Sequence, residues 1–336
     1  MPDALRRLRA CGAVGLALAV LAAPAAIADD SGPLDIRVTQ RKLNPEAPRQ
    51  ERIESLAWRG GLELTSPSRS FGGLSGLYIA PDGQEVVLLT DQGNWLTATL
   101  TYDDRGWLSG FEDARLGRLK DERGQPISQL SNRQDAEALA RRADGSWVVT
   151  FEQRHRIHQY PPGPRPDGTA EALPVPSDLP PGSNQALEAI TELPDGRLIA
   201  LREGAVSLSG QDAVYRGYLY EDGAWQPFDY VRPKPTQPTD MAVGPDGLVY
   251  VSERHWSPVG GLTIRIARFD PAALAPGAAI RATTLATMRP PLTIDNFEGI
   301  FVRESENGAP LVYVVSDDNF SAIQRTLLVM FEVLSE

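Results

Sequence analysis

Residues 75–91 read SGLYIAPDGQEVVLLTD, and this pattern decides the fold because it occurs five times along the chain. Each copy starts on an acidic or small polar residue, passes through a short apolar segment and an Asp-Gly or Asn-Gly turn, and ends in a β-rich run that closes on a carboxylate. The other four copies are DAEALARRADGSWVVTFE (135–152), EAITELPDGRLIALRE (188–203), TDMAVGPDGLVYVSE (239–253) and EGIFVRESENGAPLVYVVSD (298–317).

The turn chemistry and the repeat period predict an all-β fold. Asp-Gly and Asn-Gly permit positive φ at the tip of a tight hairpin, so each copy is expected to contain two antiparallel strands. Repeats of roughly 40–60 residues that consist of short strands are typical of four-stranded blades arranged around an axis. We therefore expect a β-propeller.

The remaining strand-like runs favour five blades. The fifth unit has only the run 327–333 before the chain ends, so its outermost strand is expected to come from 52–64. That pairing would close the ring and remove an open sheet edge. Six blades are the alternative, if residues 34–64 and the C-terminal run form two partial blades. The Pro-rich stretch 161–181 is expected to form a surface loop. Third strands are expected at 95–102, 156–160, 214–220 and 263–269.

The N-terminus has the features of a secretory signal peptide. Three arginines precede an apolar run at 13–23, and Ala26-Ile27-Ala28 places small residues before a cleavage site at Asp29. The apolar run is too short to anchor the chain in a bilayer. We expect a periplasmic or secreted protein without a membrane anchor, divided into a signal peptide (1–28), an N-terminal segment (29–51) and a propeller domain (52–336).

Composition excludes several classes of function. The chain has 336 residues, 42% of them hydrophobic, which is enough for a substantial core. Its one cysteine, Cys11, lies in the signal peptide, so the mature chain has no disulfide and no thiolate chemistry. Cleavage removes three arginines and one aspartate and changes the formal net charge from −11 to −13, which disfavours nucleic-acid binding and favours divalent cations or cationic partners.

Acidic residues recur at two positions of the repeat that a propeller brings to one mouth of its channel. Like charges crowded there need a cation, neighbouring arginines or raised pKa values. Near the start of the first strand lie Ser75, Asp135, Glu137, Glu188, Asp240 and Glu298, and at the end of the second lie Asp91, Glu152, Glu203, Glu253, Asp317 and Asp318.

Basic residues lie beside these acids. His255, next to Arg254 and Trp256, is a candidate general acid or base. His155 and His158 are three residues apart, which puts them on opposite faces of a strand and disfavours a two-histidine metal site. Guanidinium groups that could hold a phosphate or carboxylate are Arg154, Arg202 and Arg254.

Oxygen ligands with arginines suit a calcium-assisted hydrolase, in which the ion polarises an ester and activates water. On this hypothesis the metal ligands are Glu137, Glu188, Asp240, Glu298, Asp317 and Asp318. The catalytic candidates are Glu137, Glu152, Arg154 and His255, and the substrate-binding candidates are Arg154, Arg202 and Arg254.

Short phrases spread over residues 52–334 resemble the phytase-like domain family, which is described as having esterase-like activity of phytase. The resemblance implies a propeller-like repeat whose recurrent Glu and Asp carry ester or phosphoester hydrolysis, with Arg154 as an anion contact and the fourth repeat departing at Asp240 and Met241. The histidine-acid phytase motif RHGxRxP is absent. The matching phrases are GGLSGL (72–77), DAEAL (135–139), FEQR (151–154), EAI (188–190), LREG (201–204), SER (252–254), FEGI (297–300) and SDDNF (316–320).

Three functions therefore stay open for the sequence. The first is an exported hydrolase of a small phosphoester or carboxylester, assisted by calcium. The second is a propeller without catalytic activity that binds a ligand or a partner protein at the same mouth. The third is a lactonase-like propeller with a single divalent ion. The sequence decides neither the substrate nor the oligomeric state.

Overall fold

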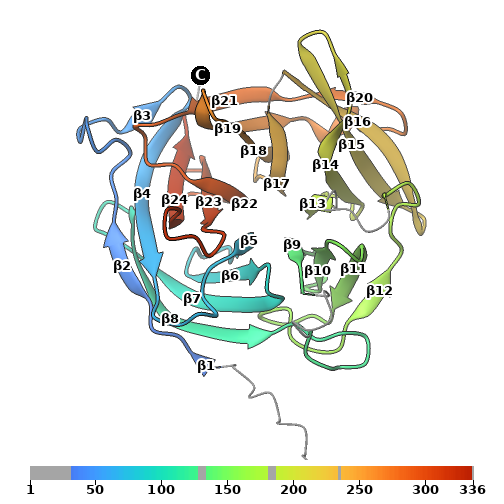
Figure 1. Ribbon diagram of the computed structural model, residues 1–336, viewed down its shortest axis with the longest axis horizontal. Helices are drawn as coiled ribbons and strands as arrows, with labels where there is room; N and C mark the ends of the chain where they lie inside the picture. Colours follow the sequence, from blue (N-terminus) through green and yellow to red (C-terminus); the bar gives the residue numbers. More distant parts are fainter. Residues whose placement is uncertain (1–31, 128–133, 181–186, 234–235, 335–336) are drawn as a thin grey trace, which may run out of the picture.

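The computed structural model describes residues 32–127, 134–180, 187–233 and 236–334 as a five-bladed β-propeller. The expected signal peptide lies outside these residues. Figure 1 shows five sheets around one axis, with the first strand of each repeat innermost. The alternative of six blades is wrong, because residues 34–64 and the C-terminal run share one sheet. No helix among the described residues is long and apolar enough to cross a membrane.

Blades 1 to 3 follow each other in chain order, and each is given from the axis outward. Blade 1 has β5 (Leu74–Ile79), β6 (Glu85–Thr90), β7 (Asn94–Tyr102), β8 (Leu108–Arg118) and β1 (Gly32–Pro33). Blade 2 has β9 (Ala136–Arg141), β10 (Trp147–Phe151), β11 (Arg156–Tyr160) and β12 (Glu171–Leu173). Blade 3 has β13 (Leu187–Glu192), β14 (Leu198–Ser209), β15 (Asp212–Glu221), β16 (Ala224–Pro233) and β20 (Ala279–Arg281).

Blades 4 and 5 complete the ring. Blade 4 has β17 (Gln237–Val243), β18 (Val249–Ser257), β19 (Gly261–Phe269) and β21 (Thr283–Met288). Blade 5 has β22 (Asn296–Glu304), β23 (Pro310–Asp317), β24 (Thr326–Val333), β4 (Leu56–Thr65) and β2 (Arg37–Gln40), and β3 (Arg52–Ile53) pairs with β4.

The N-terminal strand closes the ring as the sequence predicts. β4 pairs with β24 in an antiparallel register that joins Leu56 to Val333 and Leu64 to Thr326. Two differences concern outer strands. β1 and β2, which precede residue 52, extend blades 1 and 5, and the described part of the Pro-rich stretch contains β12, so that stretch is not only a loop.

The Asp-Gly and Asn-Gly turns have the predicted conformation, since the glycine of each turn has φ between +77° and +86°. Each turn joins the first strand of a blade to the second at the end of the propeller opposite the acidic residues. Five clusters of buried apolar side chains fill the five interfaces between neighbouring blades, so the core forms a ring around the axis.

Phe331→Ala is expected to lower the free energy of unfolding by about 3–5 kcal/mol, the usual range for a buried phenylalanine. Phe331 on β24 is fully buried, and its ring meets Trp58 of β4 edge to face at 5.4 Å, so it packs across the closure of the ring. Urea denaturation measures the change. Ile323→Ala is the control, because Ile323 is 91% exposed, and an equal loss in both variants would contradict the assignment.

Candidate functional site

A β-bulge interrupts the start of the innermost strand of every blade. It positions the acidic residues near the start of these strands, which form the first tier of the site. In blade 3, Leu187 pairs with Arg202 and Ala189 with Leu201, so Glu188 between them has no partner residue across the ladder. Glu137 and Glu298 occupy the same position in blades 2 and 5. A bulged residue interrupts the alternation of side chains between the two faces of the strand, so its side chain points in a different direction. Three glutamates therefore turn toward the axis at one depth.

Hydroxyl residues occupy the bulge in the other two blades. Ser75 Oγ donates to Ala136 O at 2.7 Å, and Thr239 Oγ1 donates to Phe297 O at 2.9 Å. Each accepting carbonyl belongs to the residue before the glutamate of the next blade. Ser75 and Thr239 thus hold the backbone from which Glu137 and Glu298 project.

Asp240 lies one residue past this position. Its Oδ2 accepts the backbone N–H of Ile300 at 2.8 Å. The side chain is 1% exposed, and burial raises its pKa well above the usual range. Asp240 connects blade 4 to blade 5 and is not in either acidic cluster among the described residues.

The second tier lies at the end of the second strand of each blade. In blade 2, Phe151 pairs with Ala136, and Glu152 follows it. In blade 4, Glu253 pairs with Pro238 in the same way, and Arg254 follows it. Arg254 is therefore the residue equivalent to Glu152. The fourth blade therefore contributes a cation where the other four contribute acids. The five residues of this tier are Asp91, Glu152, Glu203, Arg254 and Asp317.

Blades 2 and 3 bring five carboxylates together in two sets of three. One set is Asp135, Glu137 and Glu152, the other is Glu152, Glu188 and Glu203, and in each set one oxygen per residue lies within 4.8 Å of the others. Calcium binds oxygen at 2.3–2.6 Å, so ligands of one ion lie up to about 5 Å apart, and both sets fit. Glu152 belongs to both. Among the described residues, no hydrogen bond or ion pair engages the carboxylates of Glu137 and Glu188.

Burial and mutual repulsion raise the pKa of these acids. Burial is the largest cause for Glu137 and Glu188, and the adjacent carboxylate adds to it, so both pKa values lie well above the usual range. Burial, with Asp317 nearby, raises the pKa of Asp91 to about 8. Burial also raises the pKa of Glu298 to about 7, although Arg254 opposes the shift. In the absence of a cation, Asp91 is therefore expected to keep its proton at neutral pH.

Arg254 is fixed inside this site. Its Nη1 donates to Asn296 Oδ1 and to Glu298 Oε1, and its Nη2 lies 3.8 Å from Glu203 Oε1. Gln237 Nε2 donates to the same Glu203 oxygen at 2.7 Å. Asn296 and Gln237 were missed by the sequence analysis, although each stands two residues before the bulge, as Asp135 does in blade 2.

The other predicted basic residues are placed differently from Arg254. Arg154 is exposed beyond Glu152, whereas Arg202 lies beside Tyr218 in the interface between blades 2 and 3. His255 is half-buried and follows Arg254 on β18, so it faces the opposite side of the strand. His155 contacts Pro180 O at 2.9 Å, and the buried His158 contacts Glu122 at 3.1 Å.

Asp317 and Asp318 shape a turn. Asp317 Oδ1 accepts the N–H of Asn319 at 2.6 Å, and Asp318 Oδ1 accepts those of Phe320 at 3.1 Å and Gly73 at 3.0 Å. Burial raises the pKa of Asp317 to about 6. Both lie at the mouth, but neither belongs to the two sets of three acids.

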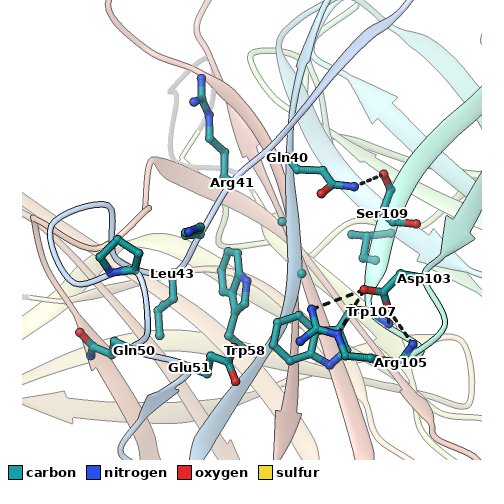
Figure 2. Close-up of a pocket in the computed structure, with 15 residues that line it drawn as sticks. Gln40, Arg41, Leu43, Gln50, Glu51, Trp58, Asp103, Arg105, Trp107 and Ser109 are labelled. Atoms are coloured by element: carbon teal, nitrogen blue, oxygen red, sulfur yellow. Dashed lines mark hydrogen bonds and ion pairs between the residues drawn. The ribbon is translucent and has the colours of Figure 1, made fainter.

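Two cavities do not contain the acids. A groove of about 450 Å³ lies on the outer wall between β4 and the β7–β8 hairpin, where Gln40 donates to Ser109 O at 3.1 Å (Figure 2). A cavity of about 370 Å³ at the other end of the inner strands is lined mainly by apolar residues, among them Leu139, Met241 and Phe301. The two ends of the channel therefore differ in polarity.

In the absence of a cation, the free energy of unfolding is expected to fall between pH 5 and pH 8. The raised pKa of Asp91 means that the folded state binds more protons than the unfolded state in this range, and such an imbalance lowers stability as pH rises. Asp91→Asn should therefore recover on the order of 3 kcal/mol more at pH 8 than at pH 5. Urea denaturation with a chelator measures both, and a pH-independent difference between the proteins would refute the shift.

Fold and site define a five-bladed propeller with an acidic mouth. The chain belongs to the phytase-like family, described as esterase-like activity of phytase, which it matches over residues 69–320. The family description is hydrolytic. No curated protein matches the chain.

Three solved structures show a distant likeness. A gluconolactonase from Xanthomonas campestris is 13% identical, with 89% of this chain and 97% of that chain covered and a TM-score of 0.38. Virginiamycin B lyase from Staphylococcus aureus is 12% identical, with 89% and 100% covered and a TM-score of 0.37. A luciferin-regenerating enzyme is 11% identical, with 77% and 91% covered and a TM-score of 0.41. Likeness at this level transfers no activity.

Proposed function

We propose that this protein is an exported hydrolase of phosphoesters or carboxylesters that works with a divalent cation, calcium being the best fit. The observation that carries the proposal is the pair of acidic sets that share Glu152. Membership of a family with a hydrolytic description supports the reaction class. The expected signal peptide supports a periplasmic or secreted location.

The chain's own residues fit this chemistry. Asp135, Glu137, Glu152, Glu188 and Glu203 would hold the cation through carboxylate oxygens. A bound divalent cation supplies Lewis-acid polarisation of the ester and a lower pKa for water. Glu298 has a pKa of about 7, so it can hold or release a proton at neutral pH, as a general acid or base must.

Arginines would orient the anionic part of the substrate. Arg254 places one fixed guanidinium among the acids, and its bonds to Glu298 and Asn296 hold it there without a ligand. Arg154 stands exposed next to the second tier and is the candidate for a mobile anion contact. His255 remains a candidate for proton transfer because of its residue type. Its side chain lies on the opposite face of β18 from that of Arg254.

Calorimetric titration of the metal-stripped mature protein with calcium tests the proposal. The same sample is then assayed against chromogenic phosphoesters and carboxylesters with and without the ion. Saturable binding together with cation-dependent turnover supports the hydrolase. Binding without turnover favours the propeller that only binds a ligand or partner, and absence of both rejects the cation site.

A further inference from the structure

We propose that the substrate of this site carries an apolar aryl or acyl group, which lies on Trp256 and Phe320 at the mouth of the channel. The inference rests on the proposed function for the polar end of the substrate. It adds the chemical class of the other end and the two residues that select it.

Exposed apolar side chains concentrate at the acidic end of the propeller. Each lies near the end of the second strand of blade 3, 4 or 5 or in the connection that follows it, and in an antiparallel blade this connection is at the end where the first strand begins. Single exposed apolar residues are ordinary, but a cluster around one opening marks a binding surface. Six of the seven large hydrophobic residues exposed in the described chain belong to it, namely Val206, Leu208, Trp256, Val259, Phe320 and Ile323.

Trp256 extends the site outward along β18. It stands two residues after Arg254 on a strand whose ladder with β19 is regular, so both side chains lie on one face and their Cα atoms are about 7 Å apart. Arg254 is bonded to Glu298 among the acids. The indole, 65% exposed, is thus the next side chain that a ligand held by these acids would meet on this strand.

Phe320 is presented by the turn that Asp317 and Asp318 shape. Asn319 and Phe320 have φ of +48° and +50°, a left-handed conformation that is costly for a bulky residue. Hydrogen bonds from their N–H groups to the two aspartates hold it. Gly72 packs so closely that a Cβ there would lie 3.0 Å from the ring of Phe320. The half-exposed ring is therefore fixed beside the acids.

These placements define a ligand with two unlike ends. The acids and a cation suit one anionic or ester head, while a polyphosphorylated polyol would bring many negative charges to a chain of formal net charge −11 and would leave both aromatic rings without a partner. Burying a phenyl-sized group on these rings should tighten binding about tenfold or more.

Calorimetry on the calcium-loaded mature chain tests the inference with benzylphosphonate and methylphosphonate, which share a non-hydrolysable head and differ in the apolar group. We expect benzylphosphonate to bind at least about tenfold more tightly. Trp256→Ser and Phe320→Ser should each reduce this ratio at least threefold. The control Val175→Ser removes the exposed apolar side chain that lies outside this cluster and should preserve the ratio.

A ratio near one, no binding of either phosphonate, or an equal effect of Val175→Ser would overturn the inference. Turnover of esters with a ratio near one would reject the aromatic contact and leave the hydrolase intact. A large ratio that depends on Trp256, without turnover of any ester, would reject the hydrolase and leave the aromatic contact intact.

Discussion

Glu152→Gln is expected to weaken calcium binding by at least about 100-fold, because one neutral amide replaces a charged ligand common to both sets of three acids. Cation-dependent turnover should disappear with it. A change confined to Glu137 or Glu188 removes an acid from one set only, so each should have a smaller effect. Calorimetric titration of the metal-stripped variants with calcium ranks their calcium affinities directly.

The stability of the metal-free variant separates lost ligation from lost folding. Glu152 is 8% exposed, and its charge is one of those that raise the pKa of Glu137 and Glu188. Removing it relieves repulsion, so the melting temperature without calcium should equal or exceed that of the wild type. Glu304→Gln, at the far end of β22, is the control. Wild-type calcium affinity in Glu152→Gln would eliminate the proposed site.

Arg232→Met is expected to lower the free energy of unfolding by about 3–5 kcal/mol, because it removes the buried ion-pair partner of the Glu253 carboxylate. The side chains of Arg232 and Glu253 are 3% and 0% exposed and form an ion pair. Tyr230 Oη donates to the same carboxylate at 2.6 Å, and Arg232 also donates to Thr284 Oγ1 at 3.0 Å. This network joins blade 3 to blade 4 directly behind Arg254.

A double variant makes this second prediction specific. Arg232→Met with Glu253→Met removes both charges and should regain most of the lost stability, since a buried pair exchanged for apolar groups is often nearly neutral. Arg281→Met is the control. It breaks the ion pair between Arg281 and Asp212, in which the Arg281 side chain is 64% exposed, and should change the free energy of unfolding by less than about 1 kcal/mol. Denaturant unfolding of all variants gives the comparison. A double variant less stable than Arg232→Met alone would contradict the argument.

The fold was predictable because its signals are local. The Asp-Gly and Asn-Gly turns specify hairpins within each copy, and the third strands predicted at 95–102, 156–160, 214–220 and 263–269 fall within or coincide with β7, β11, β15 and β19. The missing outer strand of the fifth unit pointed to the N-terminus, where β4 supplies it. β20 could not be foreseen, since its three residues pair in parallel with β16 from a distant part of the chain.

The site was predictable only to within one residue. The copies identify Glu137, Glu188 and Glu298 correctly as equivalent, but in the fourth copy the acids Asp240 and Glu253 flank the equivalent positions, which Thr239 and Arg254 occupy. A bulge is a feature of backbone pairing and adds no residue type of its own to the sequence. One extra residue reverses which side chains face the channel, so alignment by charge misassigned this blade.

The pairing of β4 with β24 has a consequence for biosynthesis. Val333 must meet Leu56, so the last blade forms only after almost the whole chain has left the ribosome. Until then β4 presents an unpaired edge, to which other chains can add. Truncation within β24 therefore does more than shorten a tail, because it removes the strand that pairs with β4 and leaves the ring open.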